Sequence, residues 1–162
     1  MTQTHSTRWT GGALLALLVL IGTSFWWMRQ ASGAAAHAFQ PDNPTVLALG
    51  KRVYQAQCAS CHGAQLQGQV NWRERGPDGL LPAPPHDASG HTWHHPDEQL
   101  FAIVKYGIPR VINKPEYRTL MPAYEGVLSD EEIVAVLSWI KSHWAPEIRE
   151  RHDAINAQAQ QR

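Results

Sequence analysis

Apolar residues recur at helical spacing in three stretches of this chain, and each stretch predicts a helix. The first stretch leads into Cys58, and its spaced positions are Val46, Leu49, Val53 and Gln57. The second starts with Pro96, carries two acids in its first turn and stops at Gly107. Its inward positions are Leu100, Ile103 and Val104. No strand pattern of comparable strength occurs, so the sequence predicts an all-α fold.

The third predicted helix has the clearest boundaries. Ser129 and Glu132 match a capping box at its start, and Pro146 marks its end. Its apolar face consists of Ile133, Val136, Leu137, Ile140 and Trp144. Beyond this helix, residues 146–162 form a polar tail with few apolar anchors, for which we expect a frayed helix or disorder.

An uncharged apolar run occupies residues 11–28, between two arginines. Its 18 residues approach the roughly 20 that a helix needs to cross a membrane. Residues 1–29 therefore form either an uncleaved membrane anchor or a cleaved signal segment with A-x-A-like sites at 34–38. The anchor is favoured, because an arginine follows the run at once and the alanines are distant from it. Residues 30–44 are expected to link the anchor to a domain spanning 45–145.

The charge balance excludes one group of functions. The 14 basic and 14 acidic residues give a formal net charge of zero, so no global field would draw the chain to nucleic acid. A local exception is a basic rim around one acid, formed by Lys105, Arg110, Lys114 and Arg118 with Glu116. This rim is a candidate for steering an acidic redox partner, although a solvated loop is the simpler interpretation.

The two cysteines and the histidine after them carry the strongest chemical signal. Cys58, Cys61 and His62 match the C-x-x-C-H pattern of covalent haem attachment. Cysteines three positions apart at a helix end can reach both vinyl groups of one porphyrin, and the next histidine then becomes an axial iron ligand. A thioredoxin-like site would need a βαβ context, and a zinc site would need a histidine nearer than His86. One covalent c-type haem is the predicted cofactor.

Met121 is the predicted second axial ligand. The other methionines, Met1 and Met28, belong to the N-terminal segment, and Pro122 stiffens the loop after Met121. A methionine that merely packs in the core is the alternative. Ligation by His62 and a thioether raises the reduction potential and leaves no open coordination position, which favours electron transfer over catalysis.

The long stretch of residues 63–95 is rich in proline and glycine, and it needs something besides its own backbone to order it. Trp72 and Trp93 are candidates for the haem pocket, where they would pack on the ring or bond to its propionates. Four histidines follow closely on one another, at His86, His91, His94 and His95. They either pack against the haem or bind a second metal, copper or zinc.

The succession of a helix, CASCHG, a long loop, a helix, MPAYEGVLSDEEI and AVLSWIK resembles the class I cytochromes c over about residues 45–145. Among them the chain is most similar to bacterial monohaem cytochromes with a long middle loop. The resemblance implies a small helical fold around one haem. It also implies that the first and last helices cross, with Gly50 and Tyr54 on one side and Trp139 on the other.

The same resemblance implies a set of site residues. Haem would be bound covalently at Cys58 and Cys61, with His62 and Met121 as axial ligands. In this family a proline carbonyl accepts a hydrogen bond from the free N–H of the axial histidine. The candidates here are Pro82, Pro84 and Pro85, of which Pro84 is included in the predicted pocket.

These observations predict an electron carrier and not an enzyme, placed at the periplasmic face of a bacterial inner membrane. The protein would be single-pass if the N-terminal segment stays uncut and soluble in the periplasm if it is cleaved. Its partners would be a redox donor, a redox acceptor and the membrane, with no nucleic acid. Two alternatives remain: a haem enzyme or gas-binding cytochrome with an open iron position, and a cytochrome subunit of a larger respiratory complex.

Overall fold

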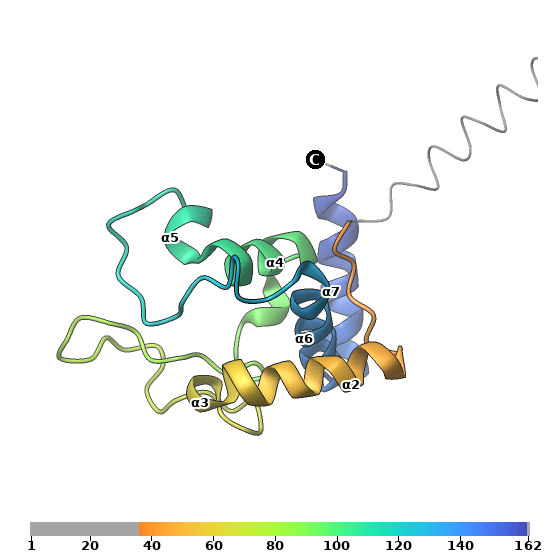
Figure 1. The fold of residues 1–162 in the computed structure, drawn as a ribbon, viewed down its shortest axis with the longest axis horizontal. Coiled ribbons are helices and arrows are strands. Elements are labelled where there is room, and N and C mark those ends of the chain that lie inside the picture. The colour runs from red at the N-terminus through yellow and green to blue at the C-terminus, as the bar shows by residue number, and fades with distance from the viewer. Residues whose placement is uncertain (1–35, 162) are drawn as a thin grey trace, which may run out of the picture. The chain divides into compact units, whose positions relative to one another are not determined.

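Helices joined by long loops make up the part of the chain that the computed structural model describes, residues 36–161 (Figure 1). The main helices are α2 (Pro44–Val53), α4 (Asp97–Tyr106), α6 (Asp130–Ser142) and α7 (Pro146–Ala159). Four shorter pieces are a π-helical turn (Tyr54–Cys58), α3 (Ala59–His62), a 3₁₀ turn (Thr92–His94) and α5 (Ile108–Val111). No strand occurs within the described range, as the all-α prediction requires.

The predicted membrane anchor, residues 1–29, lies outside the described residues. Among residues 36–161, no helix combines the length and the apolar character needed to cross a membrane.

The crossing of α2 and α6 is the centre of the fold. At Gly50 the two backbones approach so closely that an added Cβ would lie 2.0 Å from the carbonyl oxygen of Ala135 and 2.8 Å from the Cβ of Trp139. Just after α2, at the start of the π-helical turn, the ring of Tyr54 lies against that of Trp139, with 4.6 Å between centroids. The predicted crossing is therefore confirmed, and glycine is present because no side chain fits there.

The start of α6 follows the sequence prediction, whereas the helix ends at Ser142, before the predicted stop at Pro146. The Glu132 N–H donates to Ser129 Oγ at 3.2 Å, and the Ser129 N–H donates to Glu132 Oε2 at 2.9 Å, which completes the capping box. The inward face of the helix buries the predicted residues Ile133, Val136, Leu137 and Ile140, with Trp144 just beyond its end. The start of α4 differs from the prediction by one residue, because Pro96 is extended and acts as the N-cap.

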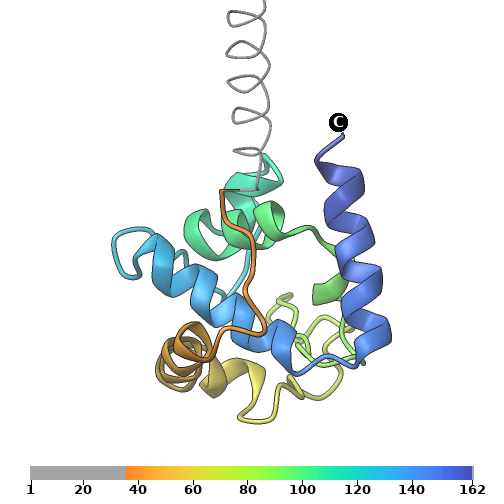
Figure 2. The same ribbon diagram turned by 90° about the vertical axis from the view of Figure 1, so that its right-hand side faces the viewer.

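The C-terminal tail differs from the expectation of a frayed helix or disorder. Residues Pro146–Ala159 form α7, which lies along one side of the domain (Figure 2). Polar contacts attach it: the Asp97 N–H donates to Asn156 Oδ1 at 2.8 Å, and Asn156 Nδ2 donates to Asp97 Oδ1 at 2.9 Å. His152 is fully buried beside them. The prediction failed because it counted apolar anchors, whereas buried polar side chains hold this helix.

The predicted linker, residues 30–44, is described from residue 36 onward, and its last part packs on the domain. Phe39 is buried, and its N–H donates to Asp97 Oδ2 at 2.8 Å. The N–H of Gln40 donates to Ser138 Oγ at 2.9 Å, so the segment contacts both α4 and α6. From His37 onward the chain belongs to one compact unit with the helices.

Two long loops, residues 63–91 and 112–123, extend from the same end of the domain, beside α3 and α5 (Figure 1). Part of the order in the first loop comes from its own backbone. The Gln69 N–H donates to the Ala83 carbonyl at 2.9 Å, and the His86 N–H donates to the Leu66 carbonyl at 2.7 Å. The loops therefore sit where they can surround a group attached to α3.

Candidate functional site

The C-x-x-C-H segment occupies a π-helical turn and the short helix α3 that follows it. The π-helical turn ends at Cys58, and α3 carries Cys61 and His62. Both thiols are free: Cys58 is half-buried and Cys61 is exposed. Burial, with a smaller contribution from Cys61, raises the pKa of Cys58 to about 11. Because no disulfide joins the two cysteines, both remain available for thioether bonds.

His62 is buried, and one of its two ring nitrogens has a defined partner. Its Nδ1 lies 2.9 Å from the carbonyl oxygen of Pro84, so Nδ1–H is the donor. Burial lowers the pKa of His62, with the Pro84 hydrogen bond opposing part of that effect. The ring is therefore neutral, with the lone pair on Nε2, which is the form that binds a metal ion. Of the three candidate prolines, Pro84 is the one that makes this contact.

His86 is the site residue whose place the sequence did not predict. Its ring stacks on that of His62, with 4.0 Å between centroids and 22° between planes. Burial, followed by the proximity of His62 and His91, lowers the pKa of His86 well below its ordinary value. The sequence left Pro82, Pro84 and Pro85 open as partners of His62, so it carried no signal that singled out His86.

The remaining histidines of the cluster do not gather around one point. His91 stacks on Trp72, with 5.4 Å between ring centroids, and lies edge-on to His95 at 5.5 Å. His94 is exposed and lies edge-on to Trp93. In residues 36–161 no group of three or more histidine, cysteine or acidic side chains is arranged to hold a metal ion. The structure gives no support to the second-metal interpretation.

Met121 lies half-buried in the irregular loop after α5, where its N–H donates to Thr119 Oγ1 at 3.1 Å. Three residues later, Tyr124 is buried, and its hydroxyl donates to the carbonyl of Gln57 at 2.9 Å. Gln57 directly precedes Cys58, so Tyr124 fastens this loop to the segment that carries the cysteines. An extended chain spans about 3.5 Å per residue, which keeps the Met121 backbone within about 10 Å of Tyr124.

Trp93 provides a test of whether the site suits a haem. The indole packs against the hydrophobic core, and its Nε1–H is buried with no acceptor among the described residues. Such an unpaired donor costs about 1–3 kcal/mol, so this indole calls for an acceptor that residues 36–161 do not supply. A porphyrin propionate is an acceptor of the right charge. Trp72, by contrast, is occupied at the loop surface, with the Arg73 guanidinium 4.0 Å from its ring centroid.

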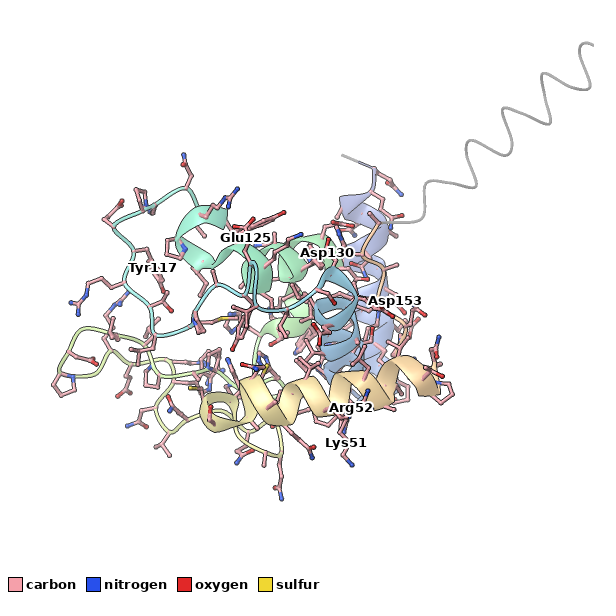
Figure 3. All side chains as sticks on the ribbon, viewed as in Figure 1. Lys51, Arg52, Tyr117, Glu125, Asp130 and Asp153 are labelled. Carbon is pink, nitrogen blue, oxygen red and sulfur yellow. The ribbon has the colours of Figure 1, made fainter. Side chains whose placement is uncertain are left out.

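Two of the four basic residues of the predicted rim are neutralised by acids that lie outside residues 105–118. Lys105 Nζ lies 2.6 Å from Asp130 Oδ1, and Arg110 Nη1 lies 3.1 Å from Glu125 Oε2. Asp130 is the first residue of α6, and the Glu125 N–H donates to the Lys105 carbonyl near the end of α4 at 2.8 Å; Figure 3 labels both acids. Lys114 is exposed and has no ion pair within the described residues. The rim is therefore a weaker source of positive field than the sequence suggested.

A neutral buried histidine next to two unpaired thiols, within a short all-helical domain, defines a class of protein: those that carry a covalent c-type haem. Residues 45–140 match the family model described as cytochrome c oxidase, cbb3-type, subunit III, and the chain belongs to this cytochrome c family. It follows that the chain carries a covalently bound c-type haem, for which Cys58 and Cys61 are in place.

A curated relative supports the same family. The chain is 34% identical to cytochrome c-555 of Prosthecochloris aestuarii over 74 residues, which cover 42% of this chain and 75% of that protein. No solved structure matches the chain. Family membership supports haem-based electron transfer as the general activity, which agrees with the prediction of an electron carrier.

Proposed function

We propose that this protein is a one-haem electron carrier whose iron is held by His62 Nε2 and Met121 Sδ. The observation that best supports this proposal is the hydrogen bond from His62 Nδ1–H to the Pro84 carbonyl, because it fixes the tautomer whose free Nε2 can ligate iron. When bound, the haem supplies a one-electron Fe(II)/Fe(III) couple. The chain's part is to keep His62 neutral and oriented, and to exclude water from the side of the ring that it occupies.

The proposed thioether ligand rests on position and chemistry. Met121 is the sole methionine in residues 36–161, and Tyr124 ties its loop to the residue before Cys58. Pro122 limits the backbone freedom of the loop next to Met121. Bound to the iron, the neutral sulfur of Met121 would favour the ferrous state and, together with His62, would leave no position open to oxygen or peroxide.

The proposed location follows from the N-terminal sequence. The apolar run at residues 11–28 serves as a single membrane span, or as a signal segment if it is cut. Either way the haem domain works at the periplasmic face of a bacterial inner membrane and exchanges electrons with a donor and an acceptor in the respiratory chain. The mass of the mature protein would show whether the segment is retained.

The ligation is tested by a Met121→Ala variant of the holoprotein. The reduced wild-type protein should not bind carbon monoxide, whereas the reduced Met121→Ala protein should bind it readily and show a lower reduction potential. Redox-difference spectra with and without the gas measure carbon monoxide binding, and a potentiometric titration measures the reduction potential. Met28→Ala is the matched control, since it removes a thioether outside the domain and should leave the spectra unchanged. Rapid carbon monoxide binding by the wild-type protein would contradict the proposal and favour a haem enzyme or gas-binding cytochrome.

A second candidate function is favoured by the matched family, whose description names a subunit of a cbb3-type oxidase. In that case the haem domain would pass electrons within a larger respiratory complex, and the N-terminal segment would take part in assembly. Mild detergent extraction followed by size-exclusion chromatography separates the two possibilities. A free carrier should elute alone, and a subunit should elute with haem-containing partners.

A further inference from the structure

The proposed function does not make use of the stacking of His86 on His62. The two rings lie nearly parallel, 4.0 Å apart at their centroids. His62 is held through Nδ1 by Pro84, and a single hydrogen bond at one ring edge leaves the ring plane free to rock about it. A second ring lying flat against the first removes that freedom.

His86 is itself fixed by three separate segments of the chain. Its Nδ1 hydrogen-bonds with Oγ1 of the buried Thr92 at 2.8 Å. Its carbonyl accepts from Trp144 Nε1 at 2.7 Å, just after α6, and its N–H donates to the Leu66 carbonyl at 2.7 Å. Because both the backbone and the side chain of His86 are hydrogen-bonded, its ring is held in a fixed position against the ring of His62.

We propose that His86 is a positioning residue that sets the plane of the His62 imidazole relative to the haem. This proposal rests on the proposed ligation of iron by His62. An aliphatic side chain could fill the same volume, but it would present no flat face and could not bond to Thr92. The planar ring combines both properties, which is the reason to assign it a role beyond packing.

The orientation of an axial imidazole has a direct spectroscopic readout. In low-spin ferric haem, the orientations of the axial ligands, the imidazole plane among them, decide which iron d orbital carries the unpaired electron. That choice distributes spin unevenly over the four pyrrole rings, and the paramagnetically shifted haem methyl resonances report it by NMR. Because the variants below leave Met121 unchanged, differences in the order and spread of the four methyl signals report changes in the plane of His62 in the intact holoprotein.

The test compares His86→Leu with His86→Phe. The leucine variant should change the order or narrow the spread of the methyl signals. The phenylalanine variant keeps a flat ring but loses the hydrogen bond to Thr92, so it should change them clearly less. His143→Leu is a matched control, since His143 is exposed at the end of α6 and should leave the pattern unchanged. Wild-type methyl shifts in His86→Leu would overturn the proposal, and so would equal changes in the leucine and phenylalanine variants.

A second variant covers the case in which His86→Leu does not fold. Thr92→Val removes the hydrogen bond to the His86 ring without touching His62, so it should shift the methyl signals in the same direction but less far. An unchanged pattern in Thr92→Val would then overturn the proposal. A merely structural role for His86 would lower the melting temperature of the variants and leave the methyl pattern as it is.

Failure of this inference can be told apart from failure of the proposed function. If the wild-type ferric protein is not low-spin, the ligation by His62 and Met121 is wrong. If all variants are low-spin with identical methyl shifts, the ligation stands and only the positioning role of His86 is lost.

Discussion

At the scale of single residues, the buried and unpaired Nε1–H of Trp93 is the most specific clue to how the cofactor is bound. Its Nε1–H is buried without an acceptor in the described part of the chain, although the ring is well packed against the core. Buried donors in proteins are almost always satisfied, so we propose that a haem propionate accepts from this indole. The sequence had placed Trp93 in the pocket only as one of two candidate tryptophans.

This assignment predicts the behaviour of Trp93→Phe. The variant keeps most of the apolar ring but loses the donor, so the holoprotein should lose about 1.5–3 kcal/mol, the range for a hydrogen bond to a charged group. Thermal unfolding of the two holoproteins measures the difference. An unchanged melting temperature would show that no carboxylate accepts from this indole.

His152, which lies apart from the C-x-x-C-H segment in the sequence, is expected to make the stability of the domain depend on pH. The ring is fully buried, its Nε2–H donates to the His95 carbonyl at 3.0 Å, and its Nδ1 has no described partner. Burial and the positive charge of Lys141 lower the pKa of His152, while Asp97 acts in the opposite direction. The folded state therefore favours the neutral ring.

The sign of the resulting pH effect follows from this lowered pKa. Between the folded pKa and the ordinary value of 6.5, the unfolded chain binds more protons than the folded one. Stability is therefore complete above about pH 6.5 and is lost as the pH falls below it. Melting temperatures between pH 8 and pH 5 should fall more steeply for the wild type than for His152→Phe, although the variant starts lower because the His95 carbonyl loses its donor. Parallel curves would rule out His152 as the titrating group.

At the scale of elements, the crossing of α2 and α6 depends on the presence of glycine, which has no side chain, at position 50. Gly50 lies against the backbone of Ala135, and backbone atoms cannot move aside as a flexible side chain can. The aromatic contact between Tyr54 and Trp139 follows one turn later and depends on the same approach. The two helices therefore pack as one rigid pair.

Gly50→Ala should destabilise the protein by roughly 1–3 kcal/mol or more, even though alanine favours helices, because the added methyl group forces α2 away from α6. Denaturant unfolding of the holoprotein measures the loss. Lys51→Ala is the control on the same helix: Lys51 is exposed and points away from α6 (Figure 3), so its effect should stay within about 0.5 kcal/mol. A Gly50→Ala protein as stable as the wild type would mean that the crossing is looser than described.

At the scale of the whole molecule, the charges are balanced both in total and locally. The formal net charge is zero, and two of the four basic rim residues are paired with Asp130 and Glu125. Exposed pairs of this kind add little stability, but they cancel much of the field that a partner would feel at a distance.

Electron-transfer rates with small charged reagents should therefore depend weakly on ionic strength. Stopped-flow oxidation by a negatively charged iron complex, measured at several salt concentrations, tests this expectation. The double variant Asp130→Asn and Glu125→Gln should expose the positive field of the rim and make the rate fall more steeply with added salt. A steep dependence already in the wild type would show that the rim steers partners despite its ion pairs.

Several features of the fold could be predicted from the sequence because their causes are local. The capping box at Ser129, the stop at Gly107 and the apolar face of α6 all depend on residues within one or two turns of each other. The C-x-x-C-H segment is local in the same sense, since its five residues are contiguous. The tail was mispredicted as frayed or disordered because Asn156 is held by Asp97, a residue 59 positions away.

What the sequence by itself determined is the identity of the chemistry: two thiols and a histidine at a spacing that suits one haem, within an all-helical domain. Only the tertiary structure decided how that histidine is held. In the structure Pro84, out of three candidate prolines, accepts from His62, and His86 lies flat against His62. The Trp93 donor has no acceptor among the described residues. These contacts join residues more than 20 positions apart or depend on burial, and neither property can be read from a local pattern.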